Sequence, residues 1–525
     1  MNLRSTASSS LRAAGAAPPE AFWLPSWHAF IKTVELGSMA ACARALDCTR
    51  AQVSRQMAEL EAQLGARLLE RSTRRLRPTP AGEVFLQHAR QALDSVAATH
   101  IALGQQGGRP QGVLRISATI TFGRIYVAPL LPPLLAAHPL LVCELILTDQ
   151  LVDLVQDSQL PNGSFGHVAP NVVKDGGAVA WGDAAIICPY LMYRFYGDKR
   201  VLEAHYANMA RSMQWMVDTS ENYIRKDLGF GDWVNLGGGA KDEVICTAYF
   251  AYLAGLMAEI ASVIGKEDDA AKYRELREHI RDAFIQAFVG QDGRILDSSQ
   301  TGYALAFTID LIPEPLRNAA ADRFVEEIAK FKWHLATGFI GTPRLLPALA
   351  LAGREDVAYR LLLNETYPSW LYQVKLGATT MWERWNGWTP EQGFADPGMN
   401  SFNHYAFGSV GQFMYEYVAG VRPLEPGFGR FIVAPRPGGG LKHASLRYRS
   451  IRGEIASKWE ALEGDRLRLT VEVPPNTTAV VSLPPGARNV TMNGTEITGL
   501  ETEVGSGSWV FEMQYAVPPL MQVSE

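Results

Sequence analysis

The chain has 525 residues, a length that suggests three or four domains rather than one. Hydrophobic residues make up 47% and charged residues 20%, so the composition is that of a globular protein and excludes a chain that is mainly disordered. Residues 1–110 hold 13 Lys or Arg against 8 Asp or Glu, a charge of +5 that leaves −10 for the remainder of a chain with net charge −5. This asymmetry predicts a polyanionic partner for the first part of the chain only.

Targeting and redox features are sparse. The five cysteines lack the spacing of metal ligands or of a disulfide framework, so we expect no metal, no cofactor and a reducing, cytoplasmic location. Residues 1–22 lack the apolar core of a signal peptide and are expected to be a flexible leader. No apolar run of about 18 residues is evident, so we expect no membrane partner.

Three short helices are predicted between residues 23 and 64. Apolar residues from Trp27 to Val34 recur at helical spacing, and Ser38 can cap a second helix that ends near Leu46. Thr49 and Gln52 have the spacing of a capping box at the start of a third helix. The inward face of that helix is predicted to consist of Val53, Met57, Leu60 and Leu64.

Residues that can contact DNA gather at the start of the third helix and in the arginine-dense loop 70–80. Such side chains reach base edges and phosphates. A long helix from Pro80 to about Ile101 follows, and its narrow apolar seam of Phe85, Ala89, Ala92 and Val96 predicts a homodimer contact. The predicted DNA-binding residues are Thr49, Arg50, Ser54, Arg55, Gln56, Arg71, Arg74 and Arg77.

The run from Phe30 to Ala89 resembles LysR-type transcriptional regulators. The resemblance is carried by Gly37-Ser38, Ala43-x-x-Leu46, Val53-Ser54-Arg55-Gln56, Leu60-Glu61, Leu64-Gly65 and Thr79-x-Ala81-Gly82. It implies a winged helix-turn-helix with a dimerisation helix over residues 23–108, bound to double-stranded DNA. Arg50 and Gln52 depart from the family pattern, which leaves the base preference open. For any single arginine, the alternative is that its side chain belongs to a solvated surface and contacts no DNA.

A short α/β segment follows the head. Strands are predicted over Gly112–Ser117 and Leu141–Leu147, with a helix over Tyr126–Ala137 between them. This order is similar to the opening of the LysR effector domain, of which only about 45 residues are present, too few for a domain. We therefore expect residues 110–156 to be a truncated effector-domain fragment that ends, without a linker, near residues 155–158.

Long amphipathic helices separated by aromatic loops dominate the next part. Helices are predicted over Glu243–Ile264, Asp269–Val289 and Asn318–Phe331. Repeated helical pairs with aromatic loops favour an α-toroid around one cleft, and aromatic faces and carboxylates are typical of carbohydrate sites.

The part from about residue 157 to 515 resembles the α-L-rhamnosidase six-hairpin glycosidases. The blocks that carry the resemblance are Asp157-Ser158-Gln159-Leu160-Pro161-Asn162-Gly163, Trp181-Gly182-Asp183, Gly231-Asp232-Trp233, Thr337-Gly338-Phe339, Thr379-Thr380-Met381-Trp382-Glu383-Arg384-Trp385 and Asn403-His404-Tyr405. The resemblance implies an (α/α)6 barrel over residues 157–420 and inverting hydrolysis of terminal α-L-rhamnose, with Glu383 as the general base. The implied substrate-binding residues are Asp183, Trp181, Asp232, Trp382, Trp385 and His404. The two block tryptophans could equally be core residues, and His404 a structural histidine.

The chain departs from this family at the general acid. The family carries the acid in a block resembling D-x-P-Q-R-D-E-R-x-G-W-x-G-D, and no such block is present. An inverting glycosidase needs a second carboxylic acid to protonate the leaving oxygen. We therefore expect an incomplete barrel, an unknown general acid and weak or no turnover. The alternatives are an active α-L-rhamnosidase and a non-functional fusion from a genomic or assembly rearrangement.

Short strands separated by Pro, Gly and Asn turns end the chain. They are predicted over Phe431–Val433, Leu446–Trp459, Leu467–Val473 and Ala479–Leu483. These strands predict a C-terminal β-sandwich over residues 421–515. The expected architecture is thus multidomain: a winged helix-turn-helix, a truncated α/β fragment, an incomplete (α/α)6 barrel and a β-sandwich.

Overall fold

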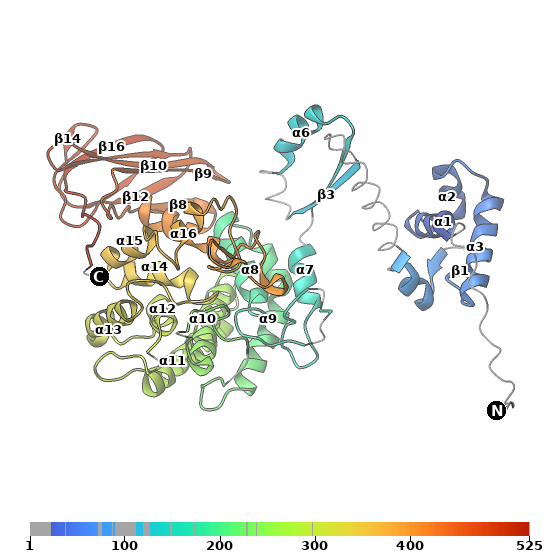
Figure 1. The fold of residues 1–525 in the computed structure, drawn as a ribbon, viewed down its shortest axis with the longest axis horizontal. Helices are drawn as coiled ribbons and strands as arrows, with labels where there is room; N and C mark the ends of the chain where they lie inside the picture. The colour runs from blue at the N-terminus through green and yellow to red at the C-terminus, as the bar shows by residue number, and fades with distance from the viewer. Residues whose placement is uncertain are drawn as a thin grey trace, which may run out of the picture. The chain divides into compact units, whose positions relative to one another are not determined.

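The computed structural model divides into two compact units, of which the first contains the helix-turn-helix head and the second the larger body. Figure 1 labels the helices and strands. We call residues 23–89 the head and residues 150–523 the body. The structure describes residues 23–36, 38–71, 76–86, 88–89, 112–118, 127–147, 150–169, 171–172, 175–226, 229–237, 239–296 and 298–523.

Both helix caps predicted for the head are confirmed. The Ser38 hydroxyl oxygen accepts the backbone N–H of Ala41 at 3.1 Å. The Thr49 hydroxyl accepts the N–H of Gln52 at 3.3 Å, and the Gln52 side chain accepts the N–H of Thr49 at 2.8 Å, which completes the capping box. The helices that these caps open, together with the first, are α1 (Trp23–Glu35), α2 (Met39–Ala45) and α3 (Arg50–Leu64).

A two-stranded antiparallel ribbon follows α3, formed by β1 (Leu69–Arg71) and β2 (Leu76–Pro78). The Glu61 carboxylate of α3 accepts the N–H groups of Leu68 and Leu69 at 2.8 and 3.1 Å, which ties the ribbon to the helix. Gly82 packs against the same turn so closely that a Cβ there would meet the Leu68 carbonyl oxygen at 2.0 Å. This contact explains why glycine occupies that position.

The seam predicted for a dimer contact lies partly in the core of the head. Phe85 packs edge-on against Trp27 and Phe30, with ring centroids 5.4 and 5.3 Å apart, and Ala89 is fully buried in the same cluster. Both residues therefore contribute to the apolar core of their own domain, and the dimer contact through this helix stays a prediction. Ala92 and Val96, the other two residues of the seam, lie outside the described residues.

The segment after the head contains two paired strands, β3 (Gly112–Ala118) and β4 (Leu141–Leu147). The helix predicted between them is shorter than expected: a 3₁₀ turn, η4 (Ala128–Leu130), leads into α6 (Leu131–Ala137). No residue of η4 or α6 is buried. An amphipathic element needs a partner layer to bury its apolar side, and these described residues lack one.

Helix α7 (Gln150–Asp157) is packed on the body. Its Gln156 amide donates to the carbonyl of Ala185 at 2.9 Å, and Asp153 lies 3.1 Å from the ring nitrogen of His205. The packing of the body therefore begins before residue 157.

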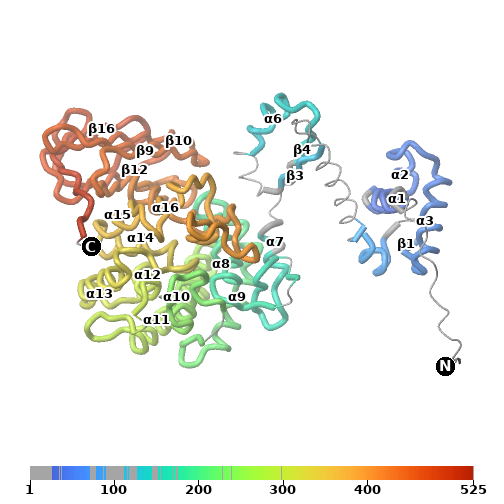
Figure 2. Tube along the Cα trace, viewed as in Figure 1, coloured from blue at the N-terminus to red at the C-terminus, as the bar shows by residue number. Residues whose placement is uncertain are grey.

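Four helical hairpins and a fifth inner helix form the helical part of the body. Each hairpin joins an inner helix to the helix that follows it, and Figure 2 traces them in chain order from α8 to α15. The inner helices pack side by side in the order α8, α10, α12, α14 and α17. The elements are α8 (Ala184–Tyr196), α9 (Arg200–Asp218), α10 (Asp242–Val263), α11 (Glu267–Phe288), α12 (Gln300–Thr308), η5 (Glu314–Leu316), α13 (Arg317–Lys330), α14 (Thr342–Leu351), α15 (Glu355–Leu362), α16 (Trp370–Lys375), η7 (Ala406–Ser409), α17 (Val410–Phe413) and the π-helical η8 (Met414–Val418).

Helix α10 lies at the centre of this packing, between α8, α9, α11 and α12. It is apolar on all sides, as a helix surrounded by other helices must be. Among the described helices it alone is long and apolar enough to cross a membrane, and 83% of its most apolar window is buried inside the body. The expectation that the chain has no apolar run of this length is therefore wrong.

The C-terminal domain is β-rich. A six-stranded sheet has the order β14-β13-β16-β11-β10-β9, and a four-stranded sheet has the order β15-β12-β8-β7. Apolar residues of both sheets, including Trp459 and Phe431, belong to one buried cluster. The strands are β7 (Val421–Pro423), β8 (Arg430–Val433), β9 (His443–Ser450), β10 (Gly453–Leu462), β11 (Arg466–Val473), β12 (Thr478–Ser482), β13 (Arg488–Met492), β14 (Thr495–Glu496), β15 (Glu501–Val504) and β16 (Gly507–Gln514). The strand predicted over Leu446–Trp459 is thus two strands joined by a turn.

Candidate active site and DNA-binding surface

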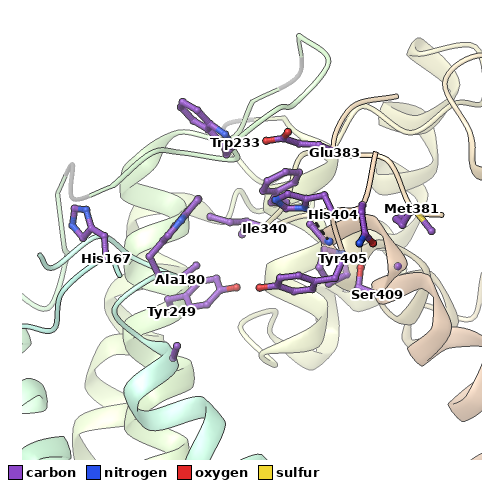
Figure 3. Close-up of a pocket in the computed structure, with 17 residues that line it drawn as sticks. His167, Ala180, Trp233, Tyr249, Ile340, Met381, Glu383, His404, Tyr405 and Ser409 are labelled. Atoms are coloured by element: carbon purple, nitrogen blue, oxygen red, sulfur yellow. Dashed lines mark hydrogen bonds between the residues drawn. The ribbon is translucent and has the colours of Figure 1, made fainter. Parts of the chain in front are cut away.

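A pocket of about 1170 Å³ opens on the helical part of the body (Figure 3). Its lining comes from the start of α8 and the loop before it, from α10 and the loop before it, and from the loops around α14, α16 and η7. The lining residues are mainly aromatic or small, with one carboxylate: His167, Ala180, Trp181, Ala184, Trp233, Tyr249, Phe339, Ile340, Pro343, Met381, Glu383, Asn403, His404, Tyr405, Ala406, Gly408 and Ser409. Aromatic faces around a few polar groups are typical of a sugar-binding pocket.

Glu383 is held at the edge of this pocket by a later segment of the chain. Its Oε2 accepts the backbone N–H of Ser401 at 2.8 Å, and its own N–H donates to the Ser401 carbonyl at 2.9 Å. Among the described residues, no donor is hydrogen-bonded to Oε1. Figure 3 shows the carboxylate directed toward Trp233 across the pocket mouth. One oxygen is thus anchored while the other is available to a water or a sugar.

His404 and Trp181, two of the predicted substrate-binding residues, also line the pocket. The His404 ring stacks against Phe339 at 5.0 Å, and its Nδ1 accepts the N–H of Ala406 at 3.3 Å. Since Nδ1 accepts, the neutral ring carries its proton on Nε2. His404 therefore combines a fixed orientation with a hydrogen-bond donor.

Asp183 is placed differently from its prediction. It is 4% exposed, does not line the pocket, and its Oδ2 accepts the N–H of Ala180 at 2.8 Å. Burial raises the pKa of Asp183 from 3.8 to about 6, and the nearby charge of Arg225 opposes this rise. Its assignment to substrate binding is corrected, because the carboxylate supports the turn that presents Trp181 rather than facing the pocket.

Asp232 is likewise a structural group. It is 2% exposed, and both of its oxygens accept hydrogen bonds. Oδ1 accepts the N–H groups of Ile340 and Gly341 at 2.8 and 3.0 Å, and Oδ2 accepts the N–H of Gly338 at 2.8 Å and the Thr301 hydroxyl. Burial outweighs these bonds and raises the pKa of Asp232. Its predicted sugar contact is therefore corrected: the carboxylate fixes the loop that carries Phe339 and Ile340 into the pocket.

The two tryptophans that flank Glu383 belong to the core. Trp385 is 1% exposed and stacks on Phe407 at 4.1 Å, and Trp382 is buried against Phe402 at 5.0 Å. Neither residue lines the pocket, so the alternative of core aromatics holds for both and their assignment to substrate binding is corrected.

Four aromatic lining residues were not predicted: Trp233, Tyr249, Phe339 and Tyr405. Trp233, Phe339 and Tyr405 lie in the quoted blocks, and Trp233 and Tyr405 directly follow residues that were chosen instead, so the blocks did contain the signal. Tyr249 lies within the apolar helix α10, where nothing distinguishes it from a core residue. Figure 3 shows the hydroxyl groups of Tyr249 and Tyr405 facing one another across the pocket.

The geometry of the site gives no indication of a metal centre. Among the residues that the structure describes, no group of three or more His, Cys, Asp or Glu side chains is arranged to hold a metal ion.

The predicted DNA-binding residues at the start of α3 differ in exposure. Thr49, Arg50 and Arg55 are exposed and Ser54 and Gln56 are half-buried, whereas Val53, Met57 and Leu60 form the buried stripe of the helix. The other predicted residues belong to the ribbon. Arg71 and Arg77 lie on β1 and β2, and their side chains and the whole of Arg74 are outside the described part of the chain.

These observations define two classes of domain in one chain. The first is a helix-turn-helix with an arginine-bearing helix, and the second is a helical-hairpin body with an aromatic pocket and one carboxylate at its mouth.

Comparisons with known proteins assign a family to each of these two parts of the chain. The chain belongs to the family described as bacterial alpha-L-rhamnosidase 6 hairpin glycosidase domain, whose model matches residues 144–418. The bacterial alpha-L-rhamnosidase C-terminal domain matches residues 420–498, and residues 24–83 match the bacterial regulatory helix-turn-helix proteins of the lysR family. The resemblances drawn from the sequence to both families are confirmed.

Each individual relative likewise matches either the body or the head of this chain. An alpha-L-rhamnosidase of Streptomyces avermitilis is 45% identical over 339 residues, 64% of this chain and 32% of that protein. The solved structure of the S. avermitilis enzyme with L-rhamnose has a TM-score of 0.66 at 42% identity and covers 69% of this chain and 36% of that one. An HTH-type transcriptional regulator of Xanthomonas campestris is 37% identical over 126 residues, 24% of this chain and 37% of that protein. The chain therefore spans about a third of the length of either kind of relative.

Proposed function

We propose that the head binds double-stranded DNA and that the body binds α-L-rhamnosides but hydrolyses ordinary rhamnosides poorly or not at all. The head resembles regulators that act on DNA, and the S. avermitilis relative is named an alpha-L-rhamnosidase whose structure contains L-rhamnose. Trp181 and His404 are proposed sugar contacts, and Glu383 is the proposed general base. Homodimerisation through residues 80–101 and a cytoplasmic location also belong to this proposal.

A single observation carries the proposed impairment: among the described lining residues, Glu383 is the one Asp or Glu. Inverting glycosidases use two carboxyl groups, roughly 6.5 to 9.5 Å apart, on opposite sides of the scissile bond. The other two candidate carboxyl groups, Asp183 and Asp232, are buried away from the pocket and engaged with backbone N–H groups. The loss of general acid catalysis alone costs about 10² to 10⁴ in rate.

The arrangement of the inner helices supports an incomplete barrel. The family name specifies six hairpins, whereas the described body contains four hairpins and the inner helix α17. The two ends of the row, α8 and α17 with η8, flank an apolar pocket of about 440 Å³ lined by Leu191, Phe195 and Tyr415 among others. In the described part of the body, the row of inner helices is open between these two ends, which supports the loss of an early hairpin together with the acid block.

The test separates binding from cleavage. Isothermal titration of the full chain with L-rhamnose is expected to show saturable binding, and methyl α-L-rhamnoside is expected to remain intact after long incubation. Release of methanol at a rate that depends on Glu383 would contradict the proposal, since it requires a donor for the leaving oxygen.

The unburied α6 favours a second candidate, a non-functional fusion that arises from a genomic or assembly rearrangement. No residue of α6 is buried and Leu130 of the preceding η4 is exposed, although the sequence pattern belongs to a packed domain. Sequencing the transcript across codons 150–165 tests this candidate. Separate messages for head and body would show that the joint arose in assembly, and one continuous message would exclude an assembly error.

A further inference from the structure

We propose that the body is a hydrolase for a restricted class of substrates: α-L-rhamnosyl compounds whose leaving group departs as a stable anion, such as the rhamnosyl fluoride and rhamnosides of acidic phenols. This inference rests on the proposed binding of rhamnosides. It follows from what the pocket retains, a positioned base, and from what its described lining lacks, a second carboxyl group.

The carboxylate of Glu383 is oriented so that it can act as the base. The Ser401 N–H anchors Oε2 of Glu383, so the carboxylate keeps its orientation when the pocket is empty. Oε1 has no donor among the described residues, and Figure 3 shows the group at the pocket mouth opposite Trp233. A water placed on Oε1 would lie on one side of a sugar held between the aromatic walls.

The reaction with such a substrate balances without an acid. Glu383 takes a proton from water as the water oxygen attacks C1 of the sugar. The bond from C1 to fluorine or to the phenolic oxygen breaks, and its electron pair leaves with the fluoride or phenolate. Glu383 then releases its proton to solvent, and the product is L-rhamnose with inverted configuration at C1. An external proton donor is required only when the leaving oxygen is strongly basic.

The remaining polar groups of the pocket can assist the leaving group without donating a proton to it. Burial raises the pKa of Tyr249, so its hydroxyl stays protonated and can serve as a hydrogen-bond donor on the side of the pocket that faces Tyr405. His404 is fixed by the Ala406 N–H with its own N–H on Nε2. Hydrogen bonds of this kind stabilise a departing anion by electrostatic preorganisation.

The experiment measures kcat/KM of the full chain for α-L-rhamnosyl fluoride, for dinitrophenyl, nitrophenyl and phenyl α-L-rhamnosides, and for methyl α-L-rhamnoside. We expect turnover of the fluoride and dinitrophenyl compounds, a steep fall as the phenol becomes more basic, and none for the methyl compound. The rate should rise with pH to a plateau without a falling limb, because one ionised base is needed and no acid. Glu383→Gln should lower turnover about 10² to 10⁴-fold. Glu391→Gln, which changes an exposed carboxylate outside the pocket lining, should leave it unchanged.

The experiment distinguishes a failure of the proposed rhamnose binding from a failure of this inference. Without calorimetric binding of L-rhamnose, the proposed function itself is wrong. Rhamnose binding without turnover of the fluoride or the dinitrophenyl compound overturns this inference alone. A bell-shaped pH profile together with cleavage of the methyl compound overturns it as well, because both require an acid. His404→Gln would then test whether His404 is that acid, by abolishing the falling limb.

Discussion

The backbone of Ser401 and the side chain and backbone of Glu383 form a reciprocal pair: the Ser401 N–H donates to Oε2 of Glu383, and the Glu383 N–H donates to the carbonyl of Ser401. A third bond, from the His404 N–H to the Met381 carbonyl at 2.9 Å, extends the pairing. The proposed base and the proposed sugar-contacting histidine are thus held in one hydrogen-bonded unit.

This pairing predicts different stabilities for two changes at Glu383. In Glu383→Gln the amide oxygen can still accept the Ser401 N–H, so thermal unfolding should match that of the natural chain. Glu383→Ala removes the acceptor and should lower the free energy of unfolding by about 1 kcal/mol. Calorimetric scans of the two variants check this prediction. Equal stability of the Ala and Gln variants would show that the bond contributes nothing.

Asp232→Asn should be strongly destabilising. One acceptor oxygen becomes an NH₂ group that faces backbone N–H donors, so at least one buried donor loses its partner, at a cost of about 2 to 3 kcal/mol. Because the loop that Asp232 holds carries Phe339 and Ile340, rhamnose affinity should fall as well. Urea unfolding and calorimetry check both effects. Asp282→Asn, at an exposed position of α11, is the matched control and should change neither.

Asp183 should make the stability of the body depend on pH. Its folded pKa of about 6 lies above the ordinary 3.8, so the folded state holds a proton that the unfolded state has released between these values. The contribution of Asp183 is therefore fully present below about pH 4 and is lost as pH rises through about 6, by roughly 3 kcal/mol at about 1.4 kcal/mol per pKa unit.

Asp183→Asn should remove this slope. Unfolding by urea, followed by the fluorescence of the body's tryptophans, should show a smaller loss of stability between pH 4 and pH 7 in the variant than in the natural chain. Arg225 is fully buried beside Asp183. Because arginine stays charged, its contribution to the free energy of unfolding does not change between pH 4 and pH 7. The prediction would be contradicted if the free energy of unfolding changed equally with pH in the variant and in the natural chain.

Arg55→Ala should weaken DNA binding without unfolding the head. Arg55 is exposed on α3, so its removal leaves the helix core intact. If it contacts a phosphate, affinity should fall about tenfold and the slope of log affinity against log salt should decrease by about 1. Gel-shift titrations at several salt concentrations check this. Glu59→Ala, exposed on the same helix, should bind equally or more tightly, and an unchanged affinity in Arg55→Ala would remove α3 from the proposed interface.

Phe85→Ala should destabilise the head by about 3 kcal/mol, because it leaves a cavity beside Trp27 and Phe30. Thermal unfolding of the full chain, monitored for the transition of the head, measures this loss. If Phe85 served a dimer contact instead, the variant would shift the sedimentation equilibrium toward monomer and leave the stability of the monomeric head unchanged.

Local features were predictable from the sequence. The caps at Ser38 and Thr49 depend on hydrogen bonds that span three residues, so a few neighbouring letters contain the whole interaction. The helices predicted over Glu243–Ile264 and Asn318–Phe331 lie within one residue of α10 and α13 at each end, because their apolar periodicity is a property of one segment. Both family resemblances were likewise contained in short blocks.

Only the tertiary structure decided which residues of those blocks face the pocket. Trp382, Glu383 and Trp385 stand within four positions of one another, yet one lies at the pocket mouth and two lie in the core. Asp232, predicted to contact the sugar, instead holds a loop more than 100 residues further along the chain. Tyr249, for which no role was predicted, reaches the cavity from α10. Burial and long-range hydrogen bonding depend on which segments meet in space, and residue type and local spacing do not contain that information.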